Sequence, residues 1–393
     1  MRFEIDVFNP SDYARGGPVT APWQPIQRAT GIGANAFQLL DGNGRGISAQ
    51  IDRIDPADPS LDTLVFSLPS RVAPGPDDYS RASATVFLEA GSGPRPEVSP
   101  VPADSPARVE LSSGALTVSL SLAPCQDDSG HDWFAGSAQS VRRGATEMLD
   151  VWRSLLGFVE HDPEKRCVQI DRLLLSQPPR AGLPDQEIHL HKSPYQLVSV
   201  CSGPIREGYT IMSAPFGYVY WDPSEGSRET LVCNFFRSVS LYRGSDCVVE
   251  ELWLKGTAAG GDAESTNLSF SARYFANMNL GFDPVVYRFE TVPDWFAVGY
   301  PDGDVHPGYG FATDAHARHL RHPHPGYPDA RNAYRTFSWE LHPSKRARCL
   351  HLFYLDGAVP VEHRAGHAWY EEIYKPLRIK IRGGRTHAGT TGL

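Results

Sequence analysis

A histidine-rich stretch, residues 306–329, concentrates side chains that can move protons. Its sequence, HPGYGFATDAHARHLRHPHPGYPD, holds five of the chain's fourteen histidines together with two tyrosines and two arginines. An imidazole titrates near neutral pH and can act as a general base, while an arginine can hold a carboxylate through two parallel hydrogen bonds. Because prolines stiffen the stretch and glycines allow tight turns, we predict a loop of fixed shape. Its predicted catalytic residues are Tyr309, His322 and His324, with Arg321 binding substrate. The alternative is a solvated polar loop or a subunit contact.

A second histidine pair lies in the segment EIHLHKSPY. If this segment is a strand, His189 and His191 point to the same face. We predict His189 as a catalytic residue and His191 as a substrate-binding residue. The pair could also bind a metal ion, but the sequence names no third ligand. We therefore predict no metal and no cofactor, and a wet strand face with two exposed histidines remains the alternative.

Composition narrows the classes of partner. The net charge of −9 argues against nucleic acid, since binding to its phosphate backbone needs a basic surface. The sequence contains no apolar run of membrane-spanning length and no secretory signal, and its six cysteines lack CxxC spacing. These features predict a cytoplasmic protein with reduced core thiols that binds neither membrane nor nucleic acid. The sequence also lacks the HExxH, Walker and GxSxG motifs. Assembly into a homo-oligomer is compatible with the sequence.

The elements that must position these residues are mostly strands. Apolar and polar residues alternate along 116–122, 268–274 and 377–382, which is the pattern of antiparallel strands with one wet face. Helical periodicity is convincing only in 145–158. The run Asp41-Gly42-Asn43-Gly44 predicts a hairpin turn. We therefore predict an all-β protein.

A proline-rich segment, 91–107, divides the chain into two predicted domains. It has no apolar periodicity, as expected of an exposed linker. Residues 1–105 are predicted to form a small N-terminal β-domain that ends in this linker. Residues 106–393 contain strand after strand without a comparable second linker, which favours one large antiparallel β-sandwich.

The opening FEIDVFNPSDYARGGPVTAPWQPI and the lines YQLVSVCSGPIREGYTIMSAPF and RSVSLYRGSDCVVEELWLKG carry a resemblance. In segment style, and over the layout of about two thirds of the chain, they resemble the β-supersandwich proteins of carbohydrate metabolism. This group includes galactose-mutarotase-like epimerases and several polysaccharide lyase and glycoside hydrolase families. The resemblance implies that a concave sheet face binds a glycan, without selecting the reaction.

Aromatic residues could contact such a glycan, since sugars pack their C–H faces on aromatic rings. Two segments, SGHDWFAGS and APFGYVYWDPSEG, are rich in rings. The predicted substrate-binding residues there are His131, Trp133, Tyr218 and Trp221. Sandwich cores also use aromatic residues, which is the alternative.

The residue types in the histidine-rich stretch fit β-elimination from a uronic-acid-containing oligosaccharide. That reaction needs a group that neutralises the uronate, a base and an acid, for which we predict Arg321, His322 or His189, and Tyr309 respectively. A glycoside hydrolase using carboxylates, such as Asp294, Asp302 and Asp304, is one alternative, and a mutarotase-like epimerase is another. A non-catalytic glycan-binding module is the alternative outside enzymes.

Of Glu250 and Glu251, only one can face a cleft, because they are neighbours in an alternating strand.

Overall fold

The structure is a computed structural model. The described residues are 2–11, 14–76, 80–91, 97–98, 108–123, 125–126, 132–133, 135–136, 138–148, 172–176, 186–190, 193–222, 227–245, 247–258, 271–280, 285–288, 296–299, 308–313, 318–320, 333–341, 347–354 and 376–382. They fold into two compact units. Unit 1 comprises Met1–Ala103, Val198–Thr210 and Ala368–Leu393, and unit 2 comprises Asp104–Leu197 and Ile211–His367. The predicted N-terminal domain was one continuous segment, whereas unit 1 also includes two later segments.

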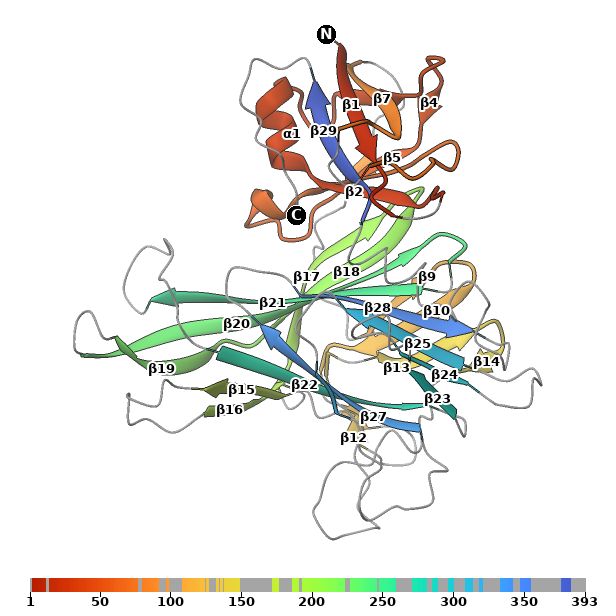
Figure 1. Ribbon diagram of the computed structural model, residues 1–393. Coiled ribbons are helices and arrows are strands. Elements are labelled where there is room, and N and C mark those ends of the chain that lie inside the picture. The colour runs from red at the N-terminus through yellow and green to blue at the C-terminus, as the bar shows by residue number, and fades with distance from the viewer. Residues whose placement is uncertain are drawn as a thin grey trace. The chain divides into compact units, whose positions relative to one another are not determined.

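Unit 1 is built on two sheets in the part of the chain that the structure describes. The β1 sheet has the order β29 (Arg378–Arg382), β1 (Arg2–Phe8), β7 (Ala84–Ala90), β3 (Phe37–Leu40) and β4 (Gly46–Ile47). The β5 sheet has the order β2 (Pro18–Pro22), β6 (Thr63–Ser67), β5 (Ala49–Asp52) and β8 (Glu97–Val98). Figure 1 shows β29, from near the end of the chain, beside β1 at its start. Of the predicted linker at 91–107, β8 pairs in parallel with β5, and most of the rest lies outside the described residues.

The described residues contain one α-helix, α1 (Trp23–Thr30), and one 3-10 turn, η1 (Pro59–Leu61). Helix α1 buries Trp23, Ile26 and Thr30, and the Trp23 ring stacks on Phe37 at 4.9 Å between centroids. The helix ends at Gly31, whose φ of 70° suits glycine and whose N–H donates to the Gln27 carbonyl. This helix was not predicted from the sequence.

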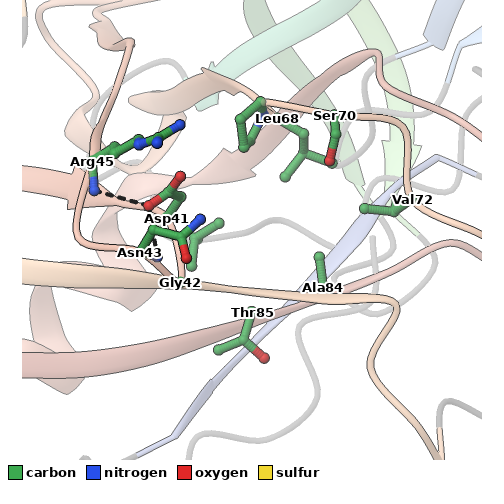
Figure 2. A pocket seen from close by; sticks show the side chains of 11 residues that line it. Asp41, Gly42, Asn43, Arg45, Leu68, Ser70, Val72, Ala84 and Thr85 are labelled. Atoms are coloured by element: carbon green, nitrogen blue, oxygen red, sulfur yellow. Dashed lines mark hydrogen bonds between the residues drawn. The ribbon is translucent and has the colours of Figure 1, made fainter.

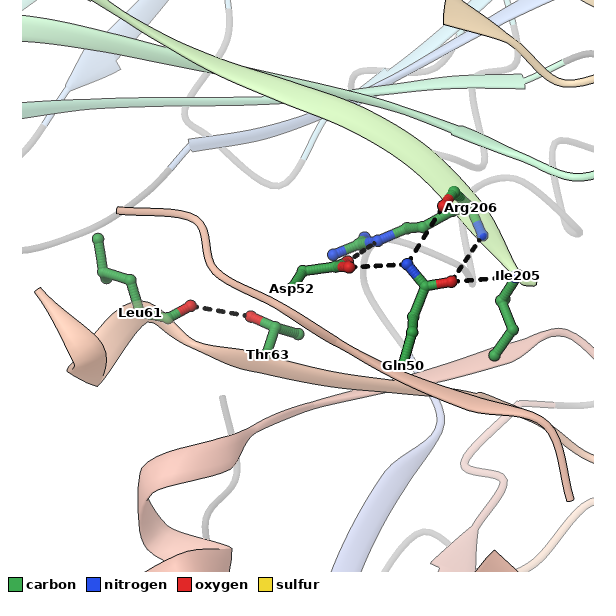
Figure 3. Close-up of polar contacts among 6 residues, drawn as sticks. All are labelled: Gln50, Asp52, Leu61, Thr63, Ile205 and Arg206. Carbon is green, nitrogen blue, oxygen red and sulfur yellow. Dashed lines mark hydrogen bonds and ion pairs between the residues drawn. The ribbon is translucent and has the colours of Figure 1, made fainter. Parts of the chain in front are cut away.

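A buried polar latch joins the segment Val198–Thr210 of unit 1 to the β5 sheet of the same unit. Gln50 Oε1 accepts hydrogen bonds from the backbone N–H groups of Ile205 and Arg206 at 2.9 and 3.0 Å. Its Nε2 donates to Asp52 Oδ1 at 2.7 Å, and Asp52 Oδ2 pairs with Arg206 Nε at 2.5 Å (Figure 3). Gly203 leaves the room for this amide, because a Cβ there would lie 2.4 Å from Gln50 Oε1. Every polar group of the latch therefore has a partner, as burial requires.

Unit 2 contains most of the strands in the described part of the chain. The β10 sheet has the order β14 (Thr146–Glu147), β13 (Ala138–Arg143), β10 (Leu116–Ser121) and β9 (Arg108–Ser112), and β11 (Cys125–Gln126) pairs with β12 (Asp132–Trp133). The β22 sheet has the order β16 (Gln186–His189), β15 (Arg172–Ser176), β22 (Ser271–Leu280), β27 (Ala333–Leu341) and β26 (Arg318–Leu320).

The remaining strands form one long sheet. Its order is β17 (Tyr195–Ser202), β18 (Arg206–Ser213), β20 (Ser227–Tyr242), β21 (Cys247–Ala258), β28 (Ala347–Tyr354), β25 (Gly308–Thr313), β24 (Phe296–Gly299) and β23 (Val285–Arg288), and β19 (Phe216–Asp222) also pairs with β20. Residues 198–210 of β17 and β18 belong to unit 1. The long ladder between β20 and β21 is visible in Figure 1.

The prediction of an all-β protein is confirmed, and one predicted element is corrected. Thr146 and Glu147, at the start of the helix predicted over 145–158, form β14 and pair with β13. Glu147 explains the change, because its carboxylate accepts hydrogen bonds from the Val141 N–H and the Ser140 hydroxyl, which closes the hairpin. Residues 149–158 lie outside the described residues.

Candidate functional site

The candidate site is a buried cluster of three charged or titratable side chains on the long sheet. We call it the Arg-Glu-His cluster, and its members are Arg237 of β20, Glu250 of β21 and His351 of β28. Opposite residues in an antiparallel ladder share a face, as do alternate residues in one strand. Val239 lies opposite Glu250, and Val248 lies opposite His351. The three side chains therefore share one face of the sheet.

Glu250 is the centre of the cluster. Its Oε1 lies 2.9 Å from Arg237 Nε, a contact that is an ion pair rather than an aligned hydrogen bond. Its Oε2 lies 3.0 Å from His351 Nε2, so a ring carrying its proton on Nε2 donates to the carboxylate. Arg237 and His351 are buried, and the Glu250 side chain is 14% exposed. Arg237 Nη1 also donates to the Gly136 carbonyl, and its Cζ lies 5.9 Å from the centre of the Phe235 ring.

The cluster keeps the carboxylate of Glu250 ionised. Burial by itself raises the pKa of this group, but the Arg237 guanidinium and the hydrogen bond from His351 outweigh burial, and the net pKa lies below its usual value of 4.5. An ionised carboxylate beside an imidazole can accept a proton or orient the ring, but it does not supply an acid at neutral pH.

Buried thiols on the described residues are unsuited to nucleophilic chemistry. Cys201, Cys233, Cys247 and Cys349 are buried and free. Burial raises the pKa of the Cys233 thiol to about 11, and burial followed by the nearby Asp52 carboxylate raises the pKa of Cys201 further. A thiol with a raised pKa is a poor nucleophile at neutral pH.

Unit 1 has a shallow pocket of about 360 Å³. The Asp41–Arg45 turn forms one wall, and Figure 2 shows the side chains of Asp41, Asn43 and Arg45 on this side, facing Leu68 and Ser70. Asp41 Oδ1 accepts the N–H groups of Asn43 and Arg45, each at 2.8 Å, and Gly44 has a φ of 77°. The hairpin turn predicted at 41–44 is therefore confirmed. The pocket could admit a small polar ligand. The hydrogen bonds within the turn explain the polar residues of its wall without a ligand.

The predicted site residues fall into two groups. The structure describes the backbone position of His189, Trp133, Tyr218, Trp221 and Tyr309, whereas His131, His191, Arg321, His322 and His324 lie outside the described residues. The roles assigned to all ten stay predictions. The carboxylates suggested for a hydrolase, Asp294, Asp302 and Asp304, also lie outside.

Register relates one predicted residue to the cluster. Tyr309 of β25 lies opposite Phe353 of β28, and Phe311 lies opposite His351. Tyr309 therefore occupies a register position on the same sheet face as the Arg-Glu-His cluster. His189 belongs to β16, at an edge of the β22 sheet, so hydrogen-bonded strands do not connect it to the cluster.

Sequence reasoning missed two members of the cluster. The sequence predicts that only one of Glu250 and Glu251 can face a cleft. In the structure, Glu250 is the residue whose side chain lies in the cluster. The signal for Arg237 and His351 was the interruption of apolar runs, NFFRSV and RCLHLFY, by a single charged or titratable residue. Such a residue in a core strand needs a buried partner.

Among the described residues, no group of three or more His, Cys, Asp or Glu side chains could hold a metal ion, and the predicted lack of a metal stays a prediction. No helix in the described part of the chain has the length and hydropathy of a membrane span.

No family model and no curated protein matches the chain, but several solved structures do. A glycosyl hydrolase family 38 protein from Enterococcus faecalis is 10% identical with a TM-score of 0.46, over 98% of this chain and 48% of its own. An alpha-mannosidase from Enterococcus faecalis V583 is 10% identical with a TM-score of 0.47, over 98% and 46%. A GH36 alpha-galactosidase from Geobacillus stearothermophilus, in complex with raffinose, is 9% identical with a TM-score of 0.31, over 64% and 41%.

The three neighbours are named as carbohydrate-active proteins, and this chain spans about half the length of the two from Enterococcus faecalis. At 10% identity or less, none of their functional residues carries over to this chain.

Proposed function

We propose that the protein is a carbohydrate-active enzyme that cleaves a uronic-acid-containing oligosaccharide by β-elimination. The observation that carries this proposal is the place of the histidine-rich stretch in unit 2. The stretch was predicted to be a loop, but parts of it are strands: Gly308–Thr313 form β25 of the long sheet, and Arg318–Leu320 form β26 of the β22 sheet. A stretch that is hydrogen-bonded into two sheets has two fixed attachment points, and segments held on such a scaffold often carry binding and catalytic residues.

The chemistry assigns one role to each residue type. His322 removes the proton from C5 of the uronate, the bond from C4 to the leaving oxygen breaks, and a double bond forms between C4 and C5. Tyr309 gives its proton to the leaving oxygen, and Arg321 pairs with the uronate carboxylate as charge develops on it. No cofactor takes part in this scheme, and the glycan is the partner.

Sheet order favours His322 over His189 as the base. Strands β16 and β26 occupy opposite edges of the β22 sheet, with β15, β22 and β27 between them. Four strand spacings correspond to about 19 Å. Arg321 directly follows β26, and the base must reach the same sugar ring as the arginine that binds its carboxylate. His322 is the residue next to Arg321 in the sequence, whereas His189 belongs to the strand at the opposite edge of the sheet.

A glycoside hydrolase or mutarotase-like epimerase is the second candidate. It is favoured by the pairing of Glu250 with His351, because in both reactions a carboxylate can work with a histidine. In the elimination scheme, by contrast, the cluster does not touch the substrate.

The test is a panel of oligosaccharides with and without uronic acid. Elimination produces a conjugated double bond that absorbs in the ultraviolet, so we expect absorbance to rise with uronate substrates alone. New reducing ends without absorbance would replace the elimination proposal by hydrolysis. Binding without any product would support a glycan-binding module instead.

A further inference from the structure

The Arg-Glu-His cluster is linked to the turn that follows β12. Arg237 Nη1 donates to the Gly136 carbonyl, and the Gly136 N–H donates to the Ser121 carbonyl at 2.8 Å. Gly136 has a φ of 77°, and a Cβ at this position would lie 2.3 Å from Cε2 of the Tyr195 ring. Glycine is therefore needed here both for its backbone conformation and for space. The turn is held on both sides, three residues after Trp133.

The same cluster is linked to the strand that carries Tyr309. Glu250 connects Arg237 to His351 of β28, and β28 is hydrogen-bonded to β25 with Phe311 opposite His351. A second connection returns to the β10 sheet, because Arg143 Nη1 of β13 donates to the Phe353 carbonyl of β28 at 3.0 Å. Phe353 is the residue opposite Tyr309. These contacts connect the turn after β12 to β28. They also connect β28 to β13, which is the next strand after that turn.

Stability alone does not explain a charged cluster at this place. Its neighbours on the same sheet face, including Val239, Leu241 and Leu252, are buried aliphatic residues. A buried ion pair gains little over well-packed aliphatic side chains, because the desolvation of both charges offsets their attraction. The cluster instead fixes geometry. The Arg237 guanidinium is planar, so it sets the relative orientation of its two partners, Glu250 and the Gly136 carbonyl.

We propose that Arg237, Glu250 and His351 are positioning residues that hold the turn after β12 and strand β25 in a fixed relation. This rests on the proposed function, in which Tyr309 of β25 is the acid, and on the prediction that Trp133, just before the turn, binds substrate. Misplacement of reacting groups by about 1 Å can lower a rate on the order of a hundredfold, so a rigid connection between the segments would be useful for catalysis.

The test replaces Arg237 by lysine and measures amide hydrogen exchange in the whole protein. Arg237→Lys keeps the charge beside Glu250 but removes the planar fork that also reaches Gly136. We expect exchange in peptides covering 132–143 to rise by about 10- to 100-fold, the range for a lost hydrogen bond to a charged group. The matched control is Arg142→Lys in β13, whose side chain is exposed and lies 3.6 Å from Glu110. It should leave exchange unchanged.

Two further variants separate positioning from folding. Glu250→Gln should raise exchange in peptides covering 308–313 as well, because it weakens the contact with His351. If a single variant fails to fold, the triple variant Arg237→Met, Glu250→Leu and His351→Leu restores an apolar face and should show the same rise at both segments. Unchanged exchange at 132–143 in every folded variant would overturn the proposal.

The exchange result is independent of the reaction. If the wild type shows no elimination, the proposed function fails while exchange still reports on the connection between the two segments. If elimination is observed, Arg237→Lys should lower kcat and KM should change by a smaller factor, with Arg142→Lys matching the wild type. Equal kinetics for the two variants would contradict a positioning role.

Discussion

Glu250 and His351 are 101 residues apart in the sequence, and their side chains meet at 3.0 Å between Oε2 and Nε2. The contact spans two neighbouring strands of the long sheet, β21 and β28, where the two residues sit diagonally on one face. Because Arg237 lies on the other side of the carboxylate, each oxygen of the buried Glu250 side chain has a partner.

Removal of the guanidinium should strongly destabilise unit 2. Arg237→Met leaves the Glu250 carboxylate buried without its cation, and breaking a buried pair in this way costs about 3–5 kcal/mol. Arg142→Met, which removes an exposed ion pair with Glu110, should cost about 1 kcal/mol or less. Chemical denaturation of both variants checks the difference. Similar losses for the two would mean that the cluster is no stronger than a surface contact.

Stability should fall in acid partly through Glu250. Its pKa in the folded protein lies below the usual 4.5, because Arg237 and His351 outweigh the opposing effect of burial. A carboxylate with a lowered pKa contributes stability above its unfolded pKa and loses it as the pH falls through the folded value. Glu250→Gln should therefore show a weaker pH dependence of the unfolding free energy than the wild type below about pH 4.5. Parallel curves in this range would show that Glu250 does not titrate as described.

The latch in unit 1 should depend on the amide of Gln50. Gln50→Ala leaves the backbone N–H groups of Ile205 and Arg206 without their acceptor, and each unsatisfied buried group costs about 1–3 kcal/mol. The control is Gln38→Ala, because the Gln38 amide makes one half-buried contact of 3.4 Å with Glu89. We expect the control to change stability by about 0.5 kcal/mol or less. A similar loss for both variants would count against the latch.

A fragment of residues 1–105 should be less stable than unit 1 in the whole chain. Such a fragment lacks β29, which pairs with β1 over Glu4–Phe8, and it lacks the residues that Gln50 and Asp52 bind. The Asp6 carboxylate, buried and paired with Arg382, would also lose its cation. Circular dichroism of the fragment during heating, beside the full chain, measures the difference. Cooperative unfolding of the fragment at the full chain's temperature would instead support an independent domain.

Local patterns in the sequence predicted the strands well. The alternation at 116–122 corresponds to β10, where Leu116, Val118 and Leu120 are buried. The wet face predicted for this strand is wrong in part, because Ser119 and Ser121 are also buried. Burial of both faces means that residues from outside the strand cover each face, and alternation within one strand does not reveal such packing.

Elements that depend on tertiary contacts were not predictable in the same way. Helix α1 contains Pro25 and has no side-chain cap, so its short sequence gives little helical signal, and the packing of Trp23 on Phe37 supports it. The Arg-Glu-His cluster joins single residues of β20, β21 and β28. Sequence alternation shows which residues share a face of one strand, but the partner strand and its register come from pairing across the fold.

The ratio of double bonds formed to reducing ends released distinguishes elimination from hydrolysis. For the wild type acting on a uronate-containing oligosaccharide, elimination predicts one unsaturated product for each bond cleaved, read as ultraviolet absorbance against reducing-end chemistry. His322→Ala should lower the rate by about a hundredfold or more, the scale for losing a general base, without changing that ratio. Arg321→Ala should reduce the rate on the natural uronate far more than on its carboxyl-reduced analogue. Reducing ends released with no matching absorbance would contradict elimination and identify the reaction as hydrolysis.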